Sequence, residues 1–153
     1  MIDRSVIDRV LATNRYLVLG TADRAGQPWV TPVFFASLDA DRVCWVSSPE
    51  SRHSRNIADR PAVAITAFDS TVAVGQAEAA YFDAEAAPAT PDEMATALQA
   101  LNARLPPGKQ LAAEDLQPHG PLLVYRATLR ERYVLVRGGD AHYGNVVDMT
   151  LRV

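Results

Sequence analysis

The chain has 153 residues, of which 48% are hydrophobic and 22% are charged, and this is the composition of one globular domain. Its net charge of −3 and pI near 5.5 exclude the broad positive field with which proteins gather nucleic acid phosphates. No stretch approaches the ~20 apolar residues of a membrane span, and the amphipathic start lacks the apolar core of a signal peptide. We therefore expect a cytoplasmic protein with neither nucleic acid nor membrane partners.

The first half of the sequence predicts two helices among closely spaced strands. Apolar residues at three- and four-residue spacing indicate a helix over 2–12. Ser48 is a plausible N-cap and Pro49 suits a first helical position, so a second helix is expected from there to about Asp59. Short apolar runs bounded by turn residues predict five strands, at 16–21, 29–37, 42–47, 62–68 and 72–82.

The second half differs in composition. Residues 84–121 are rich in Ala and Pro and predict a helical insertion that starts near Thr90, with a second short helix at 111–117. Strands are expected again at 122–129 and 132–137. Tightly turned strands favour an antiparallel barrel, because a parallel sheet needs a crossover between each pair of strands. The expected fold is one mainly β (α+β) domain over 1–153, an antiparallel split β-barrel with helical insertions.

A cluster of polar side chains marks the junction between the third strand and the second helix. Ser47, Ser48, Arg52, His53 and Arg55 lie within nine residues, and Asn56 follows them. A helix N-terminus supplies free backbone N–H groups and the positive end of the helix dipole, which together favour a phosphate. Local sequence alone equally allows serines that cap the helix and arginines on its solvated face.

The order of these pieces resembles the pyridoxamine 5′-phosphate oxidase-like split-barrel family. The resemblance lies in Ser-Ser-x-x-Ser-Arg-His-x-x-Asn-Ile, followed by Arg-Pro and a strand. Trp29-Val30-Thr31-Pro32-Val33 is similar to the preceding strand of that family, and 72–79 to a strand with a Gly-x-Ala step. The resemblance covers residues 5–82 well and the remainder poorly.

What the resemblance implies is a homodimer with two flavin mononucleotide (FMN) sites at the subunit interface. Ser47 matches a hydroxyl that contacts the phosphate, Arg52 matches the phosphate-binding arginine, and His53 stands where the family commonly has lysine. Ser48, Arg55 and Asn56 are further candidates at the same junction. The strand that follows the isoalloxazine ring in the family is matched by Thr31, Pro32 and Val33.

The expected function is therefore an FMN-binding oxidoreductase that acts on an unidentified small molecule. Two alternatives remain: a reductase of the same fold that uses the deazaflavin F420, and a non-catalytic protein that binds flavin or haem. No Ser-His-Asp or Cys-His arrangement assigns a catalytic residue. His119 and His142 have no acidic or cysteine ligand at a recognisable spacing, so no metal site is expected. The single cysteine, Cys44, lies in an apolar run and is expected to be a buried thiol.

Overall fold

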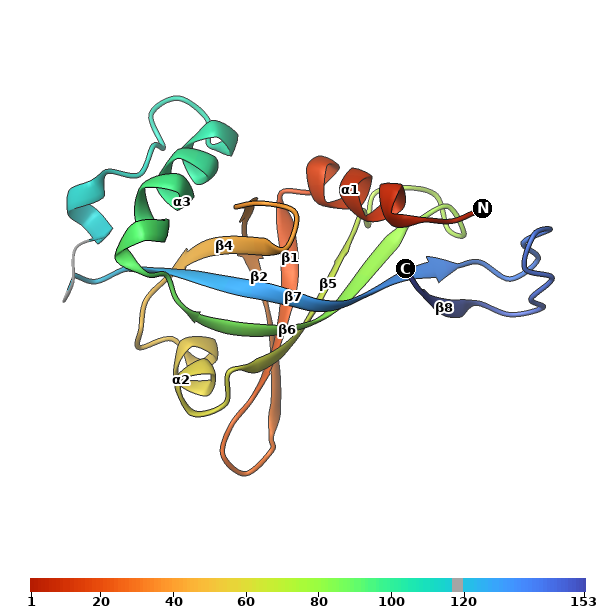
Figure 1. The fold of residues 1–153 in the computed structure, drawn as a ribbon, viewed down its shortest axis with the longest axis horizontal. Helices are drawn as coiled ribbons and strands as arrows, with labels where there is room; N and C mark the ends of the chain where they lie inside the picture. Colours follow the sequence, from red (N-terminus) through yellow and green to blue (C-terminus); the bar gives the residue numbers. More distant parts are fainter. Residues whose placement is uncertain (117–119) are drawn as a thin grey trace.

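An antiparallel sheet, curled into a half-barrel, forms the body of the molecule (Figure 1). The computed structural model describes residues 1–116 and 120–153, and within them the sheet has eight strands. The strand order is β2-β1-β5-β6-β7-β4-β3, and β8 pairs with β7 beside this path. The bounds are β1 (Tyr16–Ala22), β2 (Pro28–Phe34), β3 (Ala36–Ser37), β4 (Arg42–Ser47), β5 (Ala62–Phe68), β6 (Ala79–Pro88), β7 (Leu123–Val136) and β8 (Met149–Arg152). The predicted split-barrel class is confirmed.

Helices cover the sheet at separate places. They are α1 (Arg4–Thr13), α2 (Arg52–Asp59), α3 (Pro91–Arg104) and the 3-10 helix η1 (Ala113–Leu116). Figure 1 shows α1 and α3 on one side of the strands and α2 on the other. The helix expected at 111–117 is a single 3-10 turn, and Gln117 lies outside the described residues. Among the helices of the described residues, none has the length and apolar character of a membrane span.

Two hydrophobic cores lie on opposite faces of β4. Side chains alternate along a strand, so Val43 and Trp45 enter the barrel core while Cys44 faces α3. The second core is small and consists of Ala36, Cys44, Ala97, Leu101, Leu116 and Val124. Cys44 is fully buried, as predicted, and burial raises the pKa of its thiol to about 11.

Strand β7 is one continuous element, so the expectation of two strands at 122–129 and 132–137 is wrong. Its first half pairs with β4, its second half with β8, and its other edge with β6 along most of its length. The β6–β7 register shifts once: Asp83 faces Glu131, but Ala84 faces Leu129. Arg130 is thus an extra residue in a β-bulge, which bends the strand without ending it. The polar residues at this bulge made the sequence look interrupted.

The strand expected at 72–82 begins only at Ala79. Asp69 accepts hydrogen bonds from both the backbone N–H and the hydroxyl of Thr71, and Gly75 has a φ of +85°. These features form a turn, and Val74 is fully exposed. The segment that resembled a strand with a Gly-x-Ala step is therefore a loop, and the corresponding strand follows it.

Helix α3 is anchored to the sheet by ion pairs at its first turn. Strand β6 runs to Pro88, so the first residues of the expected insertion at 84–121 are strand rather than helix. Glu93 accepts a hydrogen bond from the backbone N–H of Thr90 (2.9 Å), and its carboxylate contacts Arg42 of β4 (2.7 Å) and Arg126 of β7 (3.4 Å). The Glu93 carboxylate therefore caps the helix and joins it to two strands.

Replacing Glu93 by alanine should destabilise the protein. Glu93→Ala removes the capping carboxylate and leaves two half-buried guanidinium groups without it, which should lower the free energy of unfolding by about 1 to 3 kcal/mol. Urea denaturation would measure the change. Glu85→Ala is the matched control, because the Glu85–Arg130 pair is more than half exposed and should cost under about 1 kcal/mol. Equal losses would contradict the anchoring role.

Candidate functional site

The junction between β4 and α2 is built around Ser51, and the predicted cap at Ser48 is wrong. Ser51 is the N-cap of α2, and its hydroxyl accepts from the backbone N–H of Ser54. Ser48 instead accepts from the backbone N–H of Glu50 and closes a turn through its carbonyl, which accepts from the backbone and hydroxyl of Ser51. Pro49 therefore lies in the turn before the helix, and α2 begins at Arg52.

The hydroxyl groups of this junction meet at His53. The Oγ of Ser47 lies 2.8 Å from the His53 Nε2, and the Oγ of Ser51 lies 3.2 Å from the same atom. The Oγ atoms of Ser51 and Ser54 lie 2.8 Å apart and form a further hydrogen bond. Burial lowers the pKa of His53 below its ordinary value, so the imidazole is neutral near pH 7. The result is a compact group of hydrogen-bonding side chains, which we call the hydroxyl cluster (Ser47, Ser51, His53 and Ser54).

The guanidinium of Arg52, next to this cluster, is not neutralised by any carboxylate of the residues that the structure describes. Its guanidinium carbon lies 4.3 Å from the centroid of the Trp29 ring, which is a cation–π contact between α2 and β2. Within residues 1–116 and 120–153, the Arg52 side chain has no ion pair or hydrogen bond. The backbone N–H groups of Arg52 and His53 likewise have no acceptor in the described part of the chain, as expected in a first helical turn.

The two other candidates on α2 are already engaged. Arg55 pairs with Glu50 at 2.7 Å, and both side chains are exposed. Asn56 is buried, and its amide donates to the hydroxyl of Thr21 at 3.0 Å, which ties α2 to β1. The Arg55 guanidinium is therefore already neutralised by Glu50.

The candidates on β2 lie on two faces of the strand. Val33 is buried in the barrel core, Thr31 is half-buried on the same inward face, and Pro32 is exposed on the outer face opposite Val18. β2 ends the strand path and pairs with β1 alone along its length, so half of its backbone polar groups point away from the sheet. A ligand along this edge would contact backbone groups more readily than all three side chains.

Sequence reasoning missed Trp29 as the support of Arg52. Nothing in the local sequence links Trp29 to a residue 23 positions further along the chain. The structure brings them together because α2 packs against the beginning of β2. Ser51 and Ser54 were visible as part of the serine-rich stretch, but the hydrogen bonds that join them to His53 depend on where the helix begins.

The half-barrel, with its bent β7 and a helix packed at the end of β4, defines a split β-barrel protein. The chain belongs to the pyridoxamine 5′-phosphate oxidase family, whose model matches residues 5–133. A comparison with curated proteins found no match.

Several solved structures share this fold, and the names of these proteins mention different ligands. The heme storage protein of Vibrio cholerae is 19% identical, over 88% of this chain and 95% of its own, with a TM-score of 0.68. A FAD-binding protein of Mesorhizobium loti is 17% identical over 86% and 92%, with a TM-score of 0.65. An F420 reductase is 20% identical over 82% and 94%, with a TM-score of 0.61. At these identities the likeness shows the fold alone.

The lowered pKa of His53 predicts how the stability of the ligand-free protein depends on pH. The folded protein holds the His53 proton less firmly than the unfolded chain, so the stabilisation from the neutral imidazole is present above the ordinary pKa of ~6.5. It is lost as pH falls below that value. Between about pH 7.5 and about pH 5, the melting temperature should fall further in the wild type than in His53→Gln. Equal decreases would show that His53 does not contribute.

Proposed function

We propose that the chain binds FMN through its phosphate at the β4–α2 junction and works as a flavin-dependent oxidoreductase. The observation that carries this proposal is the unpaired Arg52 guanidinium beside the hydroxyl cluster, in a chain whose net charge is −3. Two serine hydroxyls, an imidazole, a guanidinium and free helix N–H groups form a donor set that fits a phosphate dianion. The bound flavin would supply the hydride or electron transfer.

The residues of this chain then have separate roles in binding. Arg52 supplies the charge, and its cation–π contact with Trp29 restrains the guanidinium, so less freedom is lost when the anion binds. Ser47 and His53 offer hydrogen bonds from the end of β4 and the first turn of α2. The edge of β2, with Thr31, Pro32 and Val33, would lie along the flavin ring. Arg55 and Asn56 would act from outside this set, because each donates to another side chain of the protein. Ser48 would act from the preceding turn, where its hydroxyl accepts from the backbone N–H of Glu50.

A second candidate is F420, which also carries a phosphate and would use the same donors. The structural likeness to an F420 reductase favours it as the alternative cofactor. Haem is the third candidate, because a heme storage protein shares the fold. The absorbance spectrum of the purified protein separates the three: a flavin absorbs in the blue, a deazaflavin at shorter wavelength, and haem by its Soret band.

The phosphate assignment is tested by comparing two arginines of α2. Arg52→Ala should weaken FMN binding by about 10- to 150-fold, because a charge-assisted contact is lost, while riboflavin, which has no phosphate, should bind as before. Arg55→Ala is the matched control, since Glu50 already neutralises this guanidinium, and should change the FMN affinity by less than about twofold. Fluorescence titration of the flavin measures both. Equal losses for FMN and riboflavin would refute the assignment.

We also propose that the protein is a homodimer through the outer face of its sheet. The face carries exposed apolar side chains from three neighbouring strands: Tyr16 (59%), Val30 (65%) and Phe68 (45%). Pro32 and Val18 lie between them as a cross-strand pair. A contiguous apolar surface of this kind is typical of protein–protein contacts.

Sedimentation at micromolar concentration should therefore give twice the chain mass of 16.6 kDa. Val30→Glu places a charge in the proposed interface and should shift the protein to monomer, since an unpaired charge is costly to bury. Val74→Glu is the control, because Val74 is fully exposed in the loop before β6. A monomeric wild type would remove the dimer from the proposal.

A further inference from the structure

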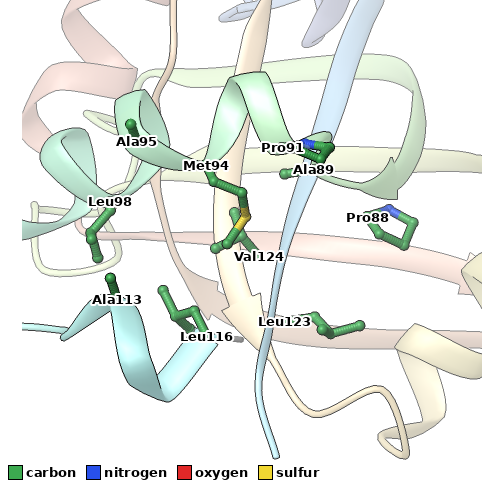
Figure 2. A pocket seen from close by; sticks show the side chains of 10 residues that line it. All are labelled: Pro88, Ala89, Pro91, Met94, Ala95, Leu98, Ala113, Leu116, Leu123 and Val124. Atoms are coloured by element: carbon green, nitrogen blue, oxygen red, sulfur yellow. The ribbon is translucent and has the colours of Figure 1, made fainter. Parts of the chain in front are cut away.

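An apolar cavity lies beneath one face of α3. It has a volume of about 550 Å³ and is bounded by α3, η1 and the adjoining ends of β6 and β7 (Figure 2). The 10 residues that line it in the described part of the chain are all apolar, and no member of the hydroxyl cluster is among them. Figure 2 shows Met94 and Leu98 reaching from α3 toward Leu116 of η1, with Val124 of β7 behind them. We propose that this cavity binds a neutral, largely hydrocarbon small molecule.

The cavity is held open by polar contacts at both ends of α3. At the first turn, Glu93 is fixed to Arg42 and Arg126. At the last turn, the guanidinium of Arg104 donates to the backbone carbonyls of Phe35 and Asn14. Movement of the helix toward the strands to close the space would break these contacts. Loss of each contact would leave a buried or half-buried charged group without its partner, which is costly. The helix therefore stays at the position that these contacts define.

The packing of α3 differs between two of its faces. Ala97 and Leu101, one turn apart, are fully buried against the sheet. Met94 and Leu98, one turn apart on the neighbouring face, remain partly exposed above the cavity. Pro88 and Pro91 form part of the wall and have restricted backbones, so the space is preformed. A volume of this size lies in the range of small-molecule pockets.

The chemistry of the walls selects the ligand. Among residues 1–116 and 120–153, no charged or amide side chain lines the cavity, so a charged ligand would lose its hydration without receiving a partner from them. The same argument disfavours a peptide or a segment of a second copy, because its backbone N–H and C=O groups would be buried without acceptors and donors. A neutral aromatic or branched hydrocarbon ligand loses neither the hydration of a charge nor the hydrogen bonds of a backbone when it is buried. The thioether of Met94, at the centre of the cavity, can adapt to its shape.

The test uses the neutral fluorescent probe N-phenyl-1-naphthylamine with the full chain. We expect one probe per chain with a dissociation constant on the order of 10 µM, from the affinity usual for ligands of this size. Its anionic sulfonate analogue should bind more weakly. Absence of binding, or equal binding of both probes, would overturn the proposal.

Substitutions then locate the probe. Met94→Trp fills the centre of the cavity and should reduce probe affinity by about tenfold or more. Ala95→Phe adds bulk at an exposed part of the wall, so it should block the probe without destabilising the protein. Ala103→Trp is the control, because Ala103 is exposed on the same helix and does not line the cavity. Unchanged probe binding in both filled variants would place the probe elsewhere and refute the proposal.

FMN titration of the same variants separates this site from the cofactor site. Met94→Trp and Ala95→Phe should retain the FMN affinity of the wild type within about twofold, since no lining residue belongs to the hydroxyl cluster. A parallel loss of FMN and probe binding would show a single site and overturn the inference. A second copy as the occupant would appear as probe exclusion from the wild-type dimer, with both filled variants sedimenting as monomers, and this result would also overturn it.

Discussion

The bulge at Arg130 is the constraint on which the barrel depends. Strand β7 must pair with β6 along one edge while serving β4 and β8 along the other, and a straight strand could not follow both directions of a curled sheet. The extra residue increases the local bend and twist between the two halves of β7. As a result, the first half of the strand supports α3 and the end of β4, and the second half supports the C-terminal strand. Both proposed ligand sites lie at the first half.

The ladder between β4 and β7 connects those two sites. Ser47 is the last residue of β4 and joins the hydroxyl cluster, and its partner in the ladder is Leu123, which lines the apolar cavity. The polar site needs the correct start of α2, because Ser51 must cap the helix before His53 and Arg52 take their positions. The apolar cavity depends on the separation between α3 and the strands, which the contacts of Glu93 and Arg104 fix at opposite ends of the helix.

Much of the fold could be predicted from local patterns, and the failures have physical causes. Strands β1, β4 and β5 were predicted within a residue because their apolar runs are short and bounded by turn residues. The loop before Ala79 was mistaken for strand because valines have high β propensity wherever they occur, and their exposure depends on tertiary packing. The serine-rich stretch correctly indicated a polar junction, but three nearby serines compete for one cap. The contact of Arg52 with Trp29 joins distant segments, so no local pattern could show it.

The burial of Cys44 has a practical consequence. Its thiol lies in the small core beneath α3, with a pKa of about 11, so a thiol-reactive reagent can reach it as thiolate only when this core opens. The labelling rate therefore reports the free energy of a local opening rather than of global unfolding, provided that α3 lifts before the barrel unfolds. Because the chain has one cysteine, the signal comes from a single position. The labelling rate of Cys44 thus measures the opening of α3 without an introduced cysteine.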